Sequence, residues 1–151
     1  MKFAVYAGLL CAGVATSATP QVVRSCDTFE ANARNLMFPV EQNTRSFANG
    51  DIRLIALDTG GEPVCCSAHL MVLFPAPEDP GGLCALISND GSLGWAGILL
   101  EKATALYDPA IGLTVSVPVI EYIDGIQDTR LSIAVNVNQQ SGVVTVRTDL
   151  P

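Results

Sequence analysis

Basic side chains are scarce in this chain of 151 residues. Eight Lys and Arg residues stand against fifteen Asp and Glu residues, which gives a formal net charge of −7 at pH 7. Nucleic acids and anionic membrane surfaces are recognised through basic patches. The charge balance therefore argues against both as partners, and the simplest role of the scattered carboxylates is to keep the protein soluble.

Histidine is represented by a single residue, His69, so a metal site built from several histidines of one subunit is excluded. The sequence also lacks a phosphate-binding glycine loop, a dinucleotide fingerprint and a Cys-x-x-Cys pair. The residues around Ser92 lack the first glycine of a nucleophile elbow. We therefore expect no cofactor, and the sequence favours a non-enzymatic role.

No apolar run is long enough to span a membrane, because a spanning helix needs about 18 or more apolar residues. The longest run, residues 3–15, follows Lys2 and ends in the small residues Thr16, Ser17 and Ala18. This pattern is typical of a secretory signal peptide. We expect residues 1–18 to be removed and the remaining chain, without an integral membrane segment, to be periplasmic or secreted.

Residues 49–151 are predicted to form a mainly β domain. Runs rich in Val, Ile and Leu alternate with turn signals about every ten residues, as in a single antiparallel β-sandwich or barrel. Strands are expected at 51–57, 64–74, 83–88, 93–100, 102–107, 112–122, 129–137 and 142–148. The alternation assigns to the core Leu113, Val115, Val117, Val119, Leu131, Ile133, Val135, Val137, Val144 and Val146. The segment 64–74 is apolar on both faces toward its end, which predicts a central strand covered on both sides.

Residues 19–48 are expected to add one short helix and a connecting segment that pack with the β domain as one unit. The helix is predicted over 25–38, because Phe29, Ala33 and Leu36 recur at helical spacing. Glu30 and Arg34 are spaced to form an ion pair on that helix.

Four cysteines follow the expected signal peptide: Cys26, Cys65, Cys66 and Cys84. An even number in an exported chain favours disulfides. If 64–74 and 83–88 form a hairpin, Cys84 lies opposite about Leu73, roughly 25 Å along the strand from Cys65. A bridge needs Cα atoms within about 7 Å. We therefore predict a bridge from Cys26 to either Cys65 or Cys66.

A soft-metal site for copper or zinc is the first alternative use of these side chains. Its ligands would be Cys65, Cys66, His69 and Cys84. In an extended strand Cys66 and His69 lie about 10 Å apart and point to opposite faces, so the site requires an intervening turn. The simpler interpretation of His69 is a hydrogen-bonded structural group within an apolar strand.

The second alternative comes from residues 49–60, where a turn glycine and an alternating strand lead into Asp58-Thr59-Gly60. This segment resembles the entry to a retroviral-type aspartic protease, in which two such motifs meet across a dimer. The resemblance implies that Asp58 is the acid/base, that Thr59 and Gly60 support it, and that Gly81-Gly82 occupy the place of the flap. It covers about a dozen residues and departs from the family where Val117-Pro118-Val119 stand in place of an apolar pair followed by glycine. The same tripeptide is also typical of a turn between two strands, in which the Asp58 side chain would cap the turn.

The sequence thus predicts an exported, disulfide-stabilised protein with a binding or structural accessory role, whose partner is a protein or small molecule that the residues do not specify. Metal binding and aspartic hydrolysis remain as alternatives. No family resemblance extends over the whole chain.

Overall fold

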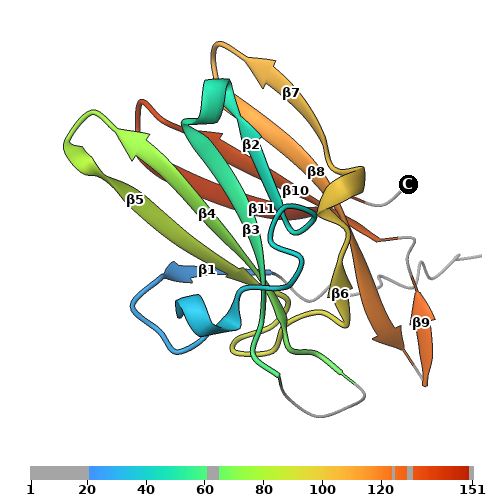
Figure 1. Cartoon of the computed structure of the whole chain (residues 1–151). Helices are drawn as coiled ribbons and strands as arrows, with labels where there is room; N and C mark the ends of the chain where they lie inside the picture. Colours follow the sequence, from blue (N-terminus) through green and yellow to red (C-terminus); the bar gives the residue numbers. More distant parts are fainter. Residues whose placement is uncertain (1–20, 61–64, 124, 129–130, 150–151) are drawn as a thin grey trace, which may run out of the picture.

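Two antiparallel β-sheets lie face to face in this protein (Figure 1). The computed structural model describes residues 21–60, 65–123, 125–128 and 131–149, so the expected signal peptide, residues 1–18, lies outside the described residues. The first sheet has the strand order β1-β5-β4-β3-β2. Its strands are β1 (Val22–Ser25), β2 (Thr44–Phe47), β3 (Ile52–Asp58), β4 (Ala68–Ala76) and β5 (Asp79–Ser88).

The second sheet has the order β11-β10-β8-β6, and β7 and β9 also pair with β8. Its strands are β6 (Gly97–Ile98), β7 (Thr104–Asp108), β8 (Gly112–Ile123), β9 (Ile126–Asp128), β10 (Ser132–Asn138) and β11 (Val143–Asp149). Short 3-10 turns occur at η1 (Ala33–Asn35), η2 (Ala48–Gly50) and η3 (Leu100–Lys102). These helical turns have three residues each, and nothing helical in the described part of the chain has the length and apolar character of a membrane-spanning segment.

The core lies between the two sheets and confirms the predicted alternation. Its members from the second sheet include Val115, Val117, Val119, Ile133 and Val135, all with no exposed surface. The first sheet contributes the opposite wall through Ile52, Leu54, Ala56, Leu70, Val72, Phe74 and Ile87. Strands β3, β4, β8 and β10 thus deliver every second side chain to the space between the sheets, which is the geometry of a β-sandwich.

The segment predicted as a central, doubly covered strand is β4, which lies between β3 and β5. Leu70 faces the core, and the neighbouring His69 on the other face is only 1% exposed.

The strand predicted at 93–100 was largely wrong. Only Gly97–Ile98 pairs as a strand, and the preceding turn buries Trp95 completely. Strands β1, β2 and β9 were missed because three or four residues give too short an alternation to detect.

The predicted helix over 25–38 is wrong. The chain forms β1 and then a series of turns with one 3-10 turn, and Phe29 is 59% exposed. Hydrogen bonds between side chains and backbone replace the backbone hydrogen bonds of a helix. The Asn32 side chain accepts from Arg34 N, and Asn35 Nδ2 donates to the Phe29 and Glu30 carbonyls. Such local side-chain hydrogen bonds compete with helix formation. The expected ion pair is also wrong, because Glu30 pairs with Arg24 on β1.

Candidate functional site

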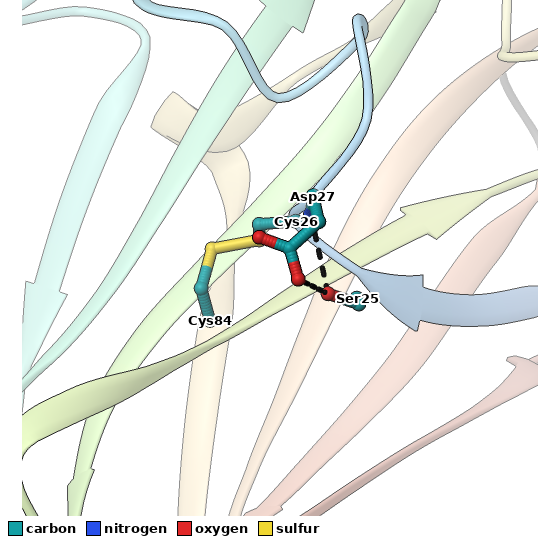
Figure 2. Close-up of a disulfide and its surroundings, with 4 residues drawn as sticks. All are labelled: Ser25, Cys26, Asp27 and Cys84. Atoms are coloured by element: carbon teal, nitrogen blue, oxygen red, sulfur yellow. Dashed lines mark hydrogen bonds between the residues drawn. A yellow bond between two sulfur atoms is a disulfide. The ribbon is translucent and has the colours of Figure 1, made fainter.

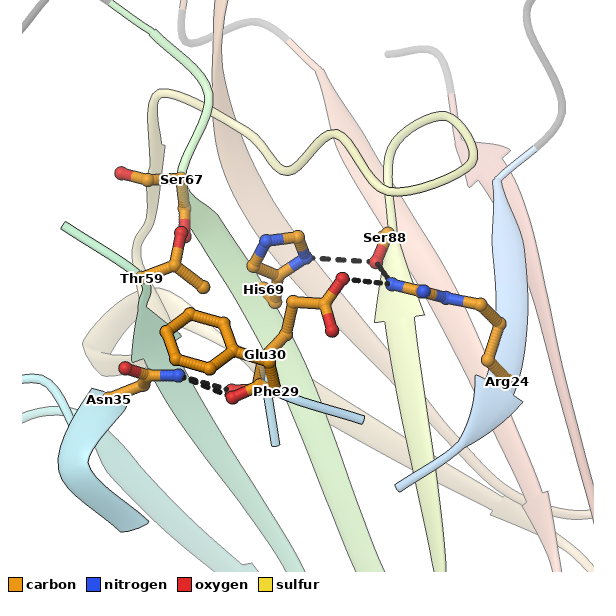
Figure 3. Close-up of polar contacts among 8 residues, drawn as sticks. All are labelled: Arg24, Phe29, Glu30, Asn35, Thr59, Ser67, His69 and Ser88. Carbon is orange, nitrogen blue, oxygen red and sulfur yellow. Dashed lines mark hydrogen bonds and ion pairs between the residues drawn. The ribbon is translucent and has the colours of Figure 1, made fainter. Parts of the chain in front are cut away.

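A buried polar cluster lies on the face of the first sheet that points away from the core (Figure 3). We define the polar cluster as Arg24 of β1, Glu30, His69 of β4 and Ser88 of β5. His69 and Ser88 lie one step beyond the paired residues Leu70 and Ile87, so their side chains point to the opposite face. Ser88 has no exposed surface, and His69 is almost as deeply buried.

Direct hydrogen bonds connect the four side chains of the polar cluster. The Ser88 hydroxyl lies 2.9 Å from His69 Nδ1. The Arg24 guanidinium donates to Ser88 Oγ at 3.0 Å and to Glu30 Oε1 at 3.2 Å. Ser88 Oγ accepts from Arg24 and keeps its own proton, so the hydroxyl donates to Nδ1 when His69 is protonated at Nε2 and accepts from it in the other tautomer. The buried Ser88 hydroxyl and His69 Nδ1 are thereby paired, as burial requires, whereas Arg24 Nε is buried without a hydrogen-bond partner among the described residues.

Burial controls the protonation of His69. Desolvation lowers the pKa of its imidazole, and the Arg24 charge lowers it further, whereas the carboxylates of Glu30 and Asp58 oppose the shift. The pKa of Glu30 is also lowered, first by a hydrogen bond from its own backbone and, more weakly, by Arg24, against the effect of desolvation. At neutral pH the cluster therefore contains a neutral imidazole beside an Arg–Glu ion pair.

A serine hydrogen-bonded to a histidine has the composition of a nucleophile and its base. Here the serine is sealed from solvent, and its oxygen is already bonded to the Arg24 guanidinium. A substrate would have to displace that guanidinium to reach Oγ. The polar cluster therefore has a structural role, because its hydrogen bonds connect β1, Glu30 and β5 with His69 of β4. This agrees with the interpretation of His69 as a hydrogen-bonded group within an apolar strand.

The polar cluster holds the N-terminal segment, residues 26–37, on the outer face of the first sheet. Glu30 from this segment interacts electrostatically with His69, and Figure 3 shows the two side chains close together. Asn35, 4% exposed, holds the segment in its turn conformation, and Met37 N donates to Ala56 O on β3 at 3.2 Å. The segment thus covers the polar face of β4 and β5.

The predicted bridge from Cys26 to Cys65 or Cys66 is wrong, because Cys26 is bonded to Cys84 (Figure 2). Their Cα atoms are 5.7 Å apart. The pairing follows from the register. Strand β1 runs antiparallel to β5 with Ser25 opposite Ala85, so Cys26, the residue that follows β1, reaches Cys84. The expectation that Cys84 lies opposite Leu73, away from Cys65, is confirmed. The error came from placing Cys26 on a helix rather than at the end of an edge strand.

The remaining two cysteines, Cys65 and Cys66, are bonded to one another. They lie in the connection that leads into β4, while Cys84 lies on β5 and is bonded elsewhere. His69 Nδ1 is occupied by Ser88. Within the described ranges, no group of three or more His, Cys, Asp or Glu side chains is arranged to hold a metal ion. The four proposed soft-metal ligands are therefore not brought together.

Asp58 ends β3 with its side chain exposed. Its Oδ1 accepts a hydrogen bond from Gly60 N at 2.9 Å, and Gly60 has a φ of +65°, as expected for a capped turn. Gly81 and Gly82, the residues matched to the flap, line an open hollow of about 520 Å³ together with Gly50. That hollow lies beside the start of β3, whereas Asp58 is at its end. Within one chain, the structure does not bring these glycines over the carboxylate.

Strand β7 presents an exposed apolar edge. It pairs with β8 on one side, and no other strand in the described part of the chain pairs with its second side. All five of its residues are exposed, including Leu106 at 75% and Tyr107 at 65%, and Ile111 in the following turn is 52% exposed. Figure 1 shows β7 at the margin of the molecule. Large apolar side chains next to unpaired backbone are unusual on an edge strand, where charges or prolines normally prevent association.

The chain matches no known protein-family model, no curated protein and no solved structure.

The sequence did not predict the polar cluster or the exposed edge of β7. Arg24 and Ser88 gave no local signal, because the strand pairing that joins them links residues 64 positions apart. The β7 segment was predicted as a strand, but its place at an edge depends on the order of the sheet.

Proposed function

We propose that this chain is an exported, disulfide-stabilised binding protein that adds an extended segment of a basic partner protein to its second sheet along β7. The observation that carries the proposal is the exposed second edge of β7 with its apolar side chains. An unpaired strand edge offers alternating N–H and C=O groups, and the complementary ligand is another extended chain.

The side chains of β7 suit such a ligand on both faces of the sheet. Leu106 is paired with Thr114, whose side chain points outward, whereas Tyr107 is paired with the core residue Leu113. A bound strand would therefore find an apolar contact above and below its backbone hydrogen bonds. Burying a side chain such as Leu106 contributes about 1.5–3 kcal/mol, enough to raise affinity by an order of magnitude or more.

The charge of the chain favours a basic partner over a second copy. Two copies with a formal charge of −7 each repel one another, whereas a basic segment is attracted to the acidic surface. The Cys26–Cys84 disulfide supports the oxidising location, because such bonds persist outside the cytosol. No contact among the described residues supports the metal-binding or hydrolytic alternatives in the same way.

A synthetic peptide of alternating Val and Thr with a Lys at each end is a suitable probe. Its binding is measured by fluorescence anisotropy, and its position by amide hydrogen exchange. We expect the amides of β7 to become protected. Replacing Leu106→Gln should weaken binding about tenfold, since it removes the larger apolar contact.

Leu93→Gln is the matched control. Leu93 is 58% exposed and lies in the turn before Trp95, away from β7, so the same substitution there should leave affinity unchanged within about twofold. Protection outside β7, or equal losses for the two variants, would contradict the proposal. Self-association of the protein through β7 at the concentrations used would identify a second copy as the occupant and would also contradict it.

A further inference from the structure

The two disulfides among the described residues differ in what they connect. Cys26 and Cys84 are separated by 58 positions, whereas Cys65 and Cys66 are neighbours in the chain, with Cα atoms 3.4 Å apart. A disulfide stabilises a fold mainly by closing a loop of the unfolded chain, and the effect grows with loop length. A bridge between neighbours closes no such loop. The Cys65–Cys66 bridge therefore contributes little to stability and calls for another role.

The backbone at this bridge is held in an unfavourable conformation. Cys66 has a φ of +125°, which residues with side chains rarely adopt. The conformation is fixed from both sides: Gly94 N donates to Cys66 O at 2.7 Å, and Thr59 N donates to Ser67 O at 3.1 Å. Backbone strain that the surrounding structure maintains is concentrated at functional sites.

The position of the bridge allows another molecule to reach it. Cys65 and Cys66 are each partly exposed and lie in the connection between β3 and β4. They are joined through Gly94 and Trp95 to the part of β8 that pairs with β6, since Ala96 N donates to Ile120 O. The binding edge of β7 lies along the other part of β8. The bridge and the proposed binding edge are thus separate sites.

We propose that Cys65–Cys66 is a redox-active disulfide that exchanges with dithiols while Cys26–Cys84 stays oxidised. A thiolate of the dithiol attacks one sulfur of the bridge, and a mixed disulfide forms as the other cysteine leaves as a thiolate. The second thiol of the donor then breaks the mixed disulfide. Two electrons and two protons pass to this protein, which holds two thiols, and the donor leaves as a disulfide.

A single tryptophan reports on the consequence for the fold. Trp95 is fully buried, and its backbone exchanges two hydrogen bonds with Ala68, at 3.0 and 2.8 Å. Gly94, the preceding residue, holds the Cys66 carbonyl. Reduction frees the backbone at Cys66 from the constraint of the bridge, so relaxation there is transmitted to the environment of the indole ring.

The test is a titration of the native protein with dithiothreitol, followed by alkylation, peptide mapping by mass spectrometry, and Trp95 fluorescence. We expect Cys65 and Cys66 to be alkylated at a dithiothreitol concentration about tenfold lower, or less, than Cys26 and Cys84. The change in Trp95 emission should accompany this first step. A parallel titration with a dithiol peptide containing Cys-x-x-Cys distinguishes a site open to any dithiol from one that prefers a peptide donor.

The double variant Cys65→Ser/Cys66→Ser is the control, and it should lack the first step while its Cys26–Cys84 bridge is reduced at the wild-type concentration. The wild-type titration decides the question without any variant. Reduction of both bridges together, or of Cys26–Cys84 first, would overturn the proposal. Free thiols at Cys65 and Cys66 in the native exported protein, or bridges between two chains, would do the same.

Discussion

At the scale of single residues, His69 makes the stability of the fold depend on pH. Its pKa in the folded state is lowered from 6.5 by burial and by Arg24, with Glu30 and Asp58 acting in the opposite direction. The unfolded chain therefore takes up a proton at a higher pH than the folded chain does. Stability rises with pH between the folded pKa and about 6.5, and it is lost as the pH falls through this window.

We expect the unfolding free energy, measured by urea denaturation, to fall from pH 7 toward pH 5, with a slope of at most about 1.4 kcal/mol per pH unit. His69 is the only histidine of the chain, so His69→Gln should flatten the curve in this range while keeping a polar partner for Ser88. Glu30, whose folded pKa is lowered from 4.5, should cause a further loss in more acidic solution in both proteins. Parallel curves for wild type and variant between pH 7 and pH 5 would show that the titration of His69 is not coupled to folding.

At the scale of elements, the contact between β4 and the turn before β6 depends on a glycine. A Cβ atom at Gly94 would collide with the backbone carbonyl of Ala68. Gly94→Ala should therefore force β4 and the turn apart and cost about 1–3 kcal/mol of stability. Thermal unfolding measures the effect. In Gly81→Ala the new methyl group meets only the side chain of Asp79, so this control should stay close to wild type, and an equal loss in both variants would contradict the packing argument.

At the scale of the whole molecule, the Cys26–Cys84 bridge holds an edge strand and the segment that follows it onto the first sheet. The chain-entropy model assigns about 4 kcal/mol to a bridge across 58 positions. The double variant Cys26→Ser/Cys84→Ser should lose about this amount in urea denaturation, a large part of the stability of a small domain. Cys65→Ser/Cys66→Ser should change stability by less than about 0.5 kcal/mol. Similar losses in the two double variants would show that the neighbouring bridge is also structural.

The mainly β class, the antiparallel pairing of most strands and most residues of the core could be predicted from the amino-acid sequence. Val115, Val117 and Ile133 were placed correctly because period-two alternation is a local property that burial enforces strand by strand. Three features could not be predicted and depend on the folded structure: the Cys26–Cys84 bridge, the contact of Arg24 with Ser88, and the position of β7 at an exposed edge. Each of these depends on the order of strands in a sheet, which brings together residues far apart in the chain. The N-terminal segment shows the same limit, because hydrogen bonds with the sheet and between its own side chains and backbone override a short helical pattern.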